Sequence, residues 1–457
     1  MNTSKDKLWF ELYGESPPAP VRRRRHHYLL GAVLLGLLFG GALAAGRGDG
    51  TARADTKSAV LAQSLGPVKA MLPQVGGPGS SPTPSALPAI ALPTVLPSLK
   101  PAPSPVASSI PHAAKPTSGL LAGKEVGGWL LSGNEQNWAY LTGSLFPFTT
   151  VSPFWFALSD DGKSVGAKQT SIPYTETVRR AHAGGLTVWP TVTGNPDTVR
   201  AIIKDPAGRG ALVVALVSLV KQTGADGIDI DFELLGKDDS PYFLAFLGSL
   251  SQQLHKSGGR LSVVLEARIN NEVAMDWPAI GKLADKVEIM IYDYHSRVTG
   301  EPGAIAPIGW VREVAAYARQ TLPTDKTFLA FGAYGYDWAP AADGGSYSGQ
   351  GLTYADVSAL LAEKAASIEH SSGVDERGYE VGLSPRFSYV DTAGGGALHE
   401  VWYEDADSLK EKLAETRDFA GVYFWRLGAE DSSLWSALRA GNSGTVPTQP
   451  TNANRGV

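Results

Sequence analysis

The 457-residue chain contains no cysteine, and it has no excess of basic residues. Without cysteine it can form neither disulfide bonds nor thiolate nucleophiles, although this absence does not decide the compartment. Its formal net charge of -5 at pH 7 and pI of about 5.9 predict no nucleic-acid binding. The eight histidines show no HExxH or similar ligand spacing, so the sequence predicts no metal site and no cofactor.

Long apolar runs are also scarce, and the clearest one lies near the N-terminus. Residues 28–45 carry no charge, and as a helix they would span ~27 Å, just enough for a bilayer core. Arg22 to Arg25 precede this run and predict a cytoplasmic leader at 1–27, a single membrane anchor and an extracytoplasmic remainder. Ala42-Leu43-Ala44 resembles a cleavage site, so a cleaved signal peptide with secretion is the alternative. The long leader and long apolar run favour the anchor.

Residues 46–118 form a second region, rich in Ala, Ser and Pro, with thirteen prolines between Pro67 and Pro116. Because proline fixes φ and removes a hydrogen-bond donor, neither helix nor sheet can propagate, and we expect a disordered spacer. The polar tail at 441–457 is expected to be disordered as well.

Residues 119–440 alternate between strand-like and helix-like segments. Eight such units in about 320 residues predict an α/β fold, a (β/α)8 TIM barrel, better than an open sheet. Segments 386–391 and 399–404 flank Gly394 to Gly396 and predict a small β-hairpin inserted between units seven and eight. The predicted barrel strands are Val126–Leu131, Thr150–Leu158, Leu186–Val192, Gly227–Leu234, Arg260–Ala267, Val287–Tyr294, Thr327–Tyr334 and Gly421–Leu427.

The fourth of these strands contains Asp226-Gly-Ile-Asp-Ile-Asp-Phe-Glu233. Strand alternation places Asp229, Asp231 and Glu233 on one face and large apolar residues on the other. Three like charges on one face repel each other, and burying them is costly, so a fold tolerates them mainly where they work chemically. The less interesting alternative is a solvated edge strand.

Other polar and aromatic residues fall at the C-terminal ends of predicted strands, where the active sites of such barrels lie. Tyr292 and Asp293 end the sixth strand, Tyr334 the seventh and Trp425 the eighth. They would converge with Glu233 at one mouth. Glu233 is the natural general acid, because neighbouring anions would raise its pKa and keep it protonated near neutral pH.

The stretch 226–233 matches the DGxDxDxE signature of family 18 glycoside hydrolases, the chitinase-like barrels. Other segments resemble that family's spore-germination and cortex-hydrolase branch. Instead of the SxGG segment of many chitinases, this chain has Trp189-Pro-Thr-Val-Thr-Gly194. The resembling segments are Val151-Ser-Pro-Phe-Trp-Phe156, Met290-Ile-Tyr-Asp293, Tyr334-Gly-Tyr-Asp-Trp338, Val401-Trp-Tyr-Glu-Asp405 and Gly421-Val-Tyr-Phe-Trp-Arg-Leu-Gly-Ala-Glu-Asp431.

The resemblance implies a retaining reaction in which the substrate's own acetamido oxygen is the nucleophile. It implies that Asp231 orients the acetamido N–H, Asp229 shares a proton with Asp231, and Tyr292 donates to the acetamido carbonyl. Asp293 would contact the sugar, above a floor formed by Trp425. Trp155 and Tyr334 are further candidates for binding substrate. Tyr292 and the tryptophans could equally be ordinary barrel-lining aromatics.

These features predict an outward-facing hydrolase of β-1,4-linked N-acetylglucosamine polymers, with peptidoglycan more expected than chitin. The first alternative is a lectin-like barrel that binds such a polysaccharide without cleaving it, although such relatives usually lose the acid. The second is a Mg²⁺ enzyme that uses the three carboxylates of one strand, which make a poor octahedral cage. Glu266 and Arg268 on the fifth strand either line the cleft or form an ion pair.

Overall fold

The computed structural model describes the chain mainly from Gly119 to Arg439. The described residues are 90–91, 115–116, 119–131, 147–167, 170, 172–270, 275–341, 345–370, 373–392 and 395–439. All of them lie in one compact unit of the chain, which includes Pro84–Val457.

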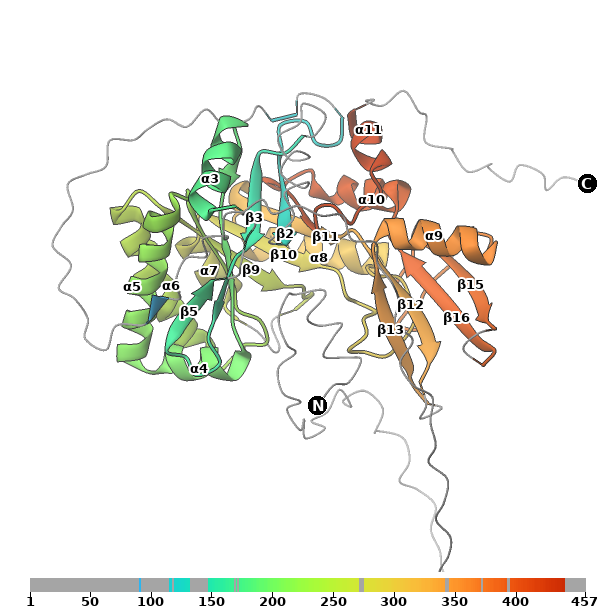
Figure 1. The fold of residues 1–457 in the computed structure, drawn as a ribbon, viewed down its shortest axis with the longest axis horizontal. Helices are drawn as coiled ribbons and strands as arrows, with labels where there is room; N and C mark the ends of the chain where they lie inside the picture. Colours follow the sequence, from blue (N-terminus) through green and yellow to red (C-terminus); the bar gives the residue numbers. More distant parts are fainter. Residues whose placement is uncertain are drawn as a thin grey trace, which may run out of the picture. The chain divides into compact units, whose positions relative to one another are not determined.

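Parallel strands form the centre of this unit, with helices around them (Figure 1), and the strand pairings close them into a ring. Within the described residues eight strand positions occupy the ring, and two of them are split into two short strands each. β17, the last strand, pairs in parallel with β2, the first, and this pairing closes the ring. The fold is therefore the predicted TIM-barrel-like α/β fold. In ring order the strands are β2 (Glu125–Leu131), β3 (Thr150–Phe154) with β4 (Phe156–Leu158), β6 (Thr187–Val188) with β7 (Thr191–Thr193), β8 (Gly227–Asp231), β9 (Arg260–Glu266), β10 (Lys286–Ile291), β11 (Thr327–Gly332) and β17 (Gly421–Trp425).

The helices surround the ring and pack their apolar side chains against the outer faces of the strands. Several begin at side-chain caps: Asn195 accepts hydrogen bonds from the first turn of α4, and Asp205 from that of α5. α5 ends at Gly224, whose φ of 73° suits glycine. Ile228 and Ile230 of β8 point into this layer and are fully buried. The helices are α3 (Tyr174–Ala183), α4 (Pro196–Lys204), α5 (Pro206–Thr223), α6 (Ser240–Lys256), α7 (Trp277–Leu283), α8 (Ile308–Thr321), α10 (Ala406–Leu413) and α11 (Ser433–Arg439), with 3-10 turns at Thr324–Lys326 and Ala414–Thr416.

The insertion between units seven and eight is larger than the predicted hairpin. The expected hairpin is present as β15 (Pro385–Asp391) and β16 (Ala397–Tyr403), but it belongs to a five-stranded antiparallel sheet. The prediction missed the other strands because they are short or glycine-rich and because the nearest of them follows β11 almost directly. They are β12 (Gly335–Pro340), β13 (Tyr347–Leu352) and β14 (Glu369–His370), and helix α9 (Tyr354–Lys364) packs through Val357 on Phe387, Val401 and Tyr403.

Two further strands lie outside the ring: β5 (Ser164–Ala167) pairs antiparallel with β4, and β1 (Ile90–Ala91) pairs with β5. No helix among the described residues is long and apolar enough to cross a membrane. The predicted leader, anchor and tail lie outside the described residues, as does almost all of the predicted spacer.

Candidate active site

The segment 226–233 begins with two residues that build the strand. Asp226 Oδ2 accepts hydrogen bonds from the main-chain N–H of Val188 at 2.7 Å and pairs with His182 Nε2 at 2.9 Å, which joins β8 to the neighbouring strand. A side chain at Gly227 would collide with the main-chain oxygen of Arg260 and the ring of Trp189, so only glycine fits. The first half of the motif therefore positions the second half.

Asp229 and Asp231 follow on the inward face of β8, and both are buried. Asp229 Oδ2 accepts hydrogen bonds from Trp129 Nε1 at 3.0 Å and Thr191 Oγ1 at 2.9 Å. Oδ1 of Asp229 and Oδ1 of Asp231 are buried without a hydrogen-bond partner among the described residues. Burial raises the pKa of Asp231 well above its ordinary value, and the charges of Glu233 and Asp229 raise it further.

A cavity of about 250 Å³ opens at the C-terminal ends of these strands. Its wall combines four carboxyl groups with a set of aromatic side chains, the composition expected of a site that binds sugar rings. The described residues that line it are Trp129, Phe154, Asp231, Glu233, Glu266, Ala267, Met290, Tyr292, Asp293, Trp310 and Trp425.

Glu233 lies in this wall just beyond the end of β8. Burial raises its pKa to about 8, and the negative charges of Glu266 and Asp293 contribute to the shift. The carboxyl group is therefore mostly protonated at neutral pH. It can donate a proton to a group bound in the cavity, as a general acid must.

Asp293 follows β10 and has a left-handed backbone conformation, with φ of 59°. Aspartate tolerates this region better than most residues, and such strained positions cluster at functional sites. Its Oδ1 accepts hydrogen bonds from the hydroxyls of Tyr334 and Tyr336, the latter at 2.9 Å. Burial raises the pKa of Asp293, and these two hydrogen bonds counteract the shift.

Tyr292 and Trp425 line the cavity as expected, and the Trp425 ring packs edge-on against Phe154, with 4.9 Å between centroids. Tyr334 is 8% exposed and touches the site through Asp293. Trp155 is elsewhere: it is 2% exposed, and its ring lies 4.6 Å from that of Tyr174 in the core outside the ring. The expectation that Trp155 lines the cleft is corrected here: Phe154, the last residue of β3, lines the cavity, and Trp155, which lies between β3 and β4, packs in the core on the other side.

Comparison with known proteins adds to this geometry. The protein-family model for glycosyl hydrolases family 18 matches residues 133–430 of this chain. The chain belongs to that family. It is 26% identical over 338 residues to the uncharacterized glycosylase YvbX of Bacillus subtilis, covering 70% of this chain and 92% of that protein. It is 27% identical to the cortical fragment-lytic enzyme of the same organism, covering 52% of this chain but only 55% of the enzyme's length.

The fold agrees with solved structures of the family. The spore cortex-lytic enzyme SleL of Bacillus cereus superposes with a TM-score of 0.60 at 24% identity, covering 69% of this chain and 73% of that one. The family match makes the chain a family 18 glycosidase, as its motifs indicated.

Below the carboxylates of this family 18 site lies a polar layer that the sequence analysis missed. Lys286 Nζ contacts Glu288 Oε1 at 2.8 Å and donates to the Tyr423 hydroxyl at 2.9 Å, while Ser262 donates to the other oxygen of Glu288. Burial opposes the charged form of Lys286, but Glu288 raises its pKa above the ordinary value. Alternation along β10 was the available signal, since residues 286, 288 and 290 all point inward.

Glu266 and Arg268, which the sequence left unassigned, have different surroundings at the end of β9. Glu266 lines the cavity, and its Oε1 accepts a hydrogen bond from the main-chain N–H of Leu234 at 3.3 Å. The Arg268 guanidinium instead lies 4.3 Å from the centroid of the Trp277 ring and donates to the main-chain oxygen of Met275. Glu266 is therefore the fourth carboxyl group of the cavity wall, with Asp231, Glu233 and Asp293.

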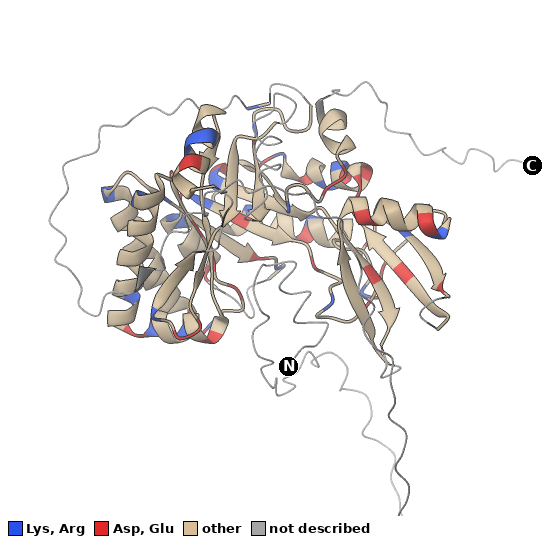
Figure 2. Ribbon diagram, viewed as in Figure 1, with Lys and Arg blue, Asp and Glu red and all other residues tan. Residues whose placement is uncertain are grey.

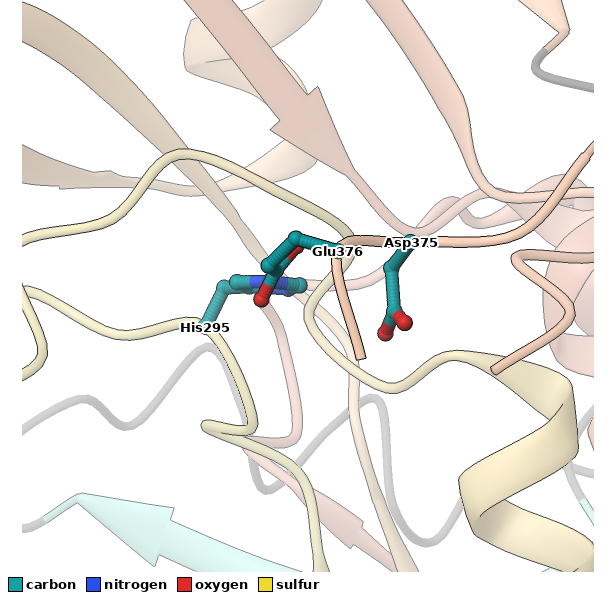
Figure 3. Close-up of side chains that lie close together, drawn as sticks. All are labelled: His295, Asp375 and Glu376. Carbon is teal, nitrogen blue, oxygen red and sulfur yellow. The ribbon is translucent and has the colours of Figure 1, made fainter. Parts of the chain in front are cut away.

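His295, Asp375 and Glu376 are the described residues whose ligand atoms could hold a metal ion, lying within 4.8 Å of one another. Figure 3 shows Glu376 against the His295 ring, with the Asp375 carboxylate to one side. His295 Nδ1 contacts the oxygen of Ala304 at 2.9 Å, and its Nε2 contacts Glu376 at 3.1 Å. These contacts tie the loop after Asp293 to a segment 81 residues away, a separation that hid the group from sequence inspection.

Proposed function

We propose that this family 18 glycosidase hydrolyses β-1,4-linked N-acetylglucosamine-containing glycans, peptidoglycan in preference to chitin, with retention of configuration. One observation carries the proposal: a glutamic acid with a pKa of about 8 in an aromatic-lined cavity next to two buried aspartates. Breaking a glycosidic bond requires an acid for the leaving oxygen and stabilisation of the anomeric carbon. Glu233 supplies the proton.

The second requirement is met by the substrate's 2-acetamido group. Asp231 accepts the acetamido N–H, and its buried Oδ1 has no hydrogen-bond partner among the described residues. A proton shared with Asp229, whose Oδ1 is also unpartnered within that part of the chain, keeps this buried pair from carrying two charges. Tyr292 donates to the acetamido oxygen, which attacks the anomeric carbon as Glu233 protonates the leaving group. Asp293 holds the sugar over the Trp425 ring.

Hydrolysis of the resulting oxazolinium ion completes the cycle. The carboxylate left on Glu233 removes a proton from water, which attacks the anomeric carbon from the face that the leaving group vacated. The acetamido group is restored, Glu233 is protonated again, and the product keeps the β configuration.

The full-length protein, purified in mild non-ionic detergent, tests this proposal on chito-oligosaccharides and on purified peptidoglycan. We expect new reducing N-acetylglucosamine ends, initially as the β anomer by NMR, and at least ~100-fold lower activity in Glu233→Gln. Binding without cleavage by the wild-type protein would favour the lectin-like alternative. Wild-type activity in Glu233→Gln would refute the assignment of the acid, and loss of activity in EDTA would favour the Mg²⁺ alternative.

We propose further that residues 28–45 anchor the enzyme in the cell membrane with its catalytic part outside, where peptidoglycan lies. The arginines that precede the apolar run and the cortical fragment-lytic relative support this location. Cell fractionation with protease treatment of intact cells tests it: the anchored protein pellets with membranes and is degraded from outside. A mature N-terminus near residue 45 in the culture medium would show secretion instead.

A further inference from the structure

The general acid Glu233 lies beyond the part of β8 that the sheet holds in place. The strand and its ladder end at Asp231, two residues earlier. Leu234, which directly follows Glu233, has a left-handed backbone conformation with φ of 58°, and its side chain is exposed. A large apolar residue rarely adopts this conformation, so contacts from the surrounding structure must hold it there.

Side chains from two other elements hold the main-chain polar groups of Leu234. Its N–H donates to Glu266 Oε1 at 3.3 Å, and its oxygen accepts a hydrogen bond from the Arg200 guanidinium. Arg200 belongs to α4, the helix that follows β7, and it is not among the described residues that line the cavity. The arginine therefore contacts the residue after the general acid without facing the cavity itself.

The buried carboxylate of Asp239 connects Arg200 to the same loop. Asp239 pairs with Arg200 Nε at 3.1 Å and with Lys204 Nζ at 2.7 Å. It also accepts the main-chain N–H of Gly236 at 3.0 Å. Burial opposes ionisation, but these partners lower the pKa of Asp239 below its ordinary value. Basic and acidic positions lie together at α4, at the lower left of Figure 2, and their ion pairs hold the loop after Glu233.

The position of Asp239 shows that its side chain serves this loop instead of its own helix. Asp239 directly precedes α6, a position at which aspartate usually accepts hydrogen bonds from the first helical turn. Its side chain makes no such cap hydrogen bond to the described first turn of α6. Its oxygens instead contact α4 and the loop that follows the general acid.

We propose that Arg200 is a positioning residue for the general acid: by holding the main chain of Leu234, it keeps Glu233 directed into the cavity and away from bulk water. The planar guanidinium donates in three directions, to Leu234, Asp239 and Asp197. A lysine ammonium is a point charge on a flexible stem and lacks this fixed geometry. Because a displaced acid slows proton transfer more than it weakens binding, the loss of Arg200 should affect kcat more than KM.

This inference rests on the proposed function for the reaction, and the full-length protein tests it on chito-oligosaccharides. In Arg200→Met we expect kcat to fall about tenfold, with KM within about twofold of wild type. The descending limb of the kcat/KM profile should also move to lower pH, because burial is the first cause of the raised pKa of Glu233 and a loosened loop admits water.

Two further variants separate this role from a general loss of stability. Arg209→Met is the matched control, since Arg209 also donates to a main-chain oxygen, that of Ile203 at 2.8 Å, but does so at the start of α5. It should leave kcat and the pH profile unchanged. Arg200→Lys keeps a cation near Asp239 and should show the same changes as Arg200→Met at smaller size. If the methionine variant does not fold, the lysine variant takes its place in every comparison.

Calorimetry provides a second measurement that needs no catalysis. Because burial raises the pKa of Glu233, Glu233→Gln should raise the melting temperature near pH 9. This gain should shrink in the Arg200→Met background, where water reaches Glu233 and its pKa moves toward the ordinary value. If Arg200 only stabilised α4, its loss would lower both melting temperatures equally and leave the gain unchanged.

An unchanged kcat in Arg200→Met, or an unchanged calorimetric gain, would overturn the inference even if the variant melted at a lower temperature. An equal loss of kcat in Arg209→Met would overturn it as well. If wild type cleaves the glycan and Arg200→Met matches it, the positioning role fails and the proposed function stands. If wild type cleaves no glycan, the proposed function fails, and the calorimetric gain alone decides whether Arg200 holds Glu233.

Discussion

At the scale of single residues, the site depends on carboxyl groups that the fold holds in a costly environment. Glu233, Asp231, Asp229 and Asp293 all have pKa values above the ordinary range, and burial is the first cause for each. Neutral forms cost less to bury than charged forms. The protonated acid that catalysis requires is therefore also the form that the folded protein prefers.

The pH dependence of activity should report this acid. Because only protonated Glu233 can donate, kcat/KM should fall as pH rises, with a midpoint at about 8. Glu266→Gln removes one negative charge near Glu233, so the midpoint should move to lower pH. Glu363→Gln removes an exposed charge on α9 and is the control, which should leave the midpoint in place. A descending limb that does not respond to Glu266 would contradict the electrostatic coupling between the two residues.

The stability of the fold should also depend on the ionisation of Glu233. The folded-state pKa of about 8 lies above the ordinary value of 4.5, so Glu233 contributes stability that is present at low pH and lost as pH rises through 8. Glu233→Gln cannot ionise and escapes this loss. Calorimetry should show the variant melting at least ~2 °C above wild type at pH 9, with a smaller difference at pH 5. Equal differences at both pH values would refute the buried-acid assignment.

At the scale of elements, the inserted sheet contributes a direct contact to the active site. β12 continues from β11 with two intervening residues and carries Tyr336, whose hydroxyl donates to Asp293. The loop after Asp293 contacts the insertion a second time through His295 and Glu376. The strained conformation of Asp293 is thus held from two sides, and we infer that the insertion positions the sugar contact.

Tyr336→Phe tests this role while preserving the shape of the side chain. Loss of one hydrogen bond to Asp293 should lower kcat/KM about 3–10-fold, mainly through KM, because Asp293 is proposed to contact the sugar in the ground state. Calorimetry should show a change in Tm below ~3 °C. Tyr347→Phe, on the exposed face of β13, is the matched control and should change neither quantity. Unchanged kinetics in Tyr336→Phe would mean that Tyr334 suffices.

At the scale of the whole molecule, the barrel interior has a polar layer beneath the catalytic face. Lys286 and Glu288 of β10 and Tyr423 of β17 are buried, and Lys286 contacts both of the others. Burial raises the pKa of Glu288 to about 7, and the charge of Asp229 adds to this effect against the opposing pull of Lys286. The layer joins strands that are distant in sequence and electrostatically supports Asp229 above it.

Lys286→Met should therefore destabilise the whole barrel. It leaves Glu288 without its cation, at a cost of about 3–5 kcal/mol in urea unfolding at pH 8, and less at pH 5, where Glu288 is protonated. Lys286→Met/Glu288→Met should recover most of the loss. Lys163→Met, which breaks an exposed ion pair with Asp161, should leave the urea midpoint nearly unchanged. A double variant no more stable than the single one would show that the loss comes from packing.

Local sequence determined the barrel rhythm, the acidic face of β8 and the residues that converge at the cavity. Each of these follows from short-range periodicity: alternation along a strand decides which side chains face inward, and parallel strands bring their C-terminal ends to one rim. Asp231, Glu233, Tyr292, Asp293 and Trp425 could therefore be placed together without coordinates. The family motifs added the chemistry expected of them.

Only the tertiary structure decided contacts between residues far apart in the chain. Trp129 reaches Asp229 across 100 positions, and Tyr336 reaches Asp293 across 43. Trp155 and Phe154 are adjacent aromatic residues, and only the tertiary structure shows that Phe154 lines the cavity while Trp155 packs against Tyr174. Glu266 lines the cavity, whereas the guanidinium of Arg268, two residues later, lies over the ring of Trp277. Such contacts depend on which surfaces meet after folding, so they cannot be predicted from residue spacing along one strand.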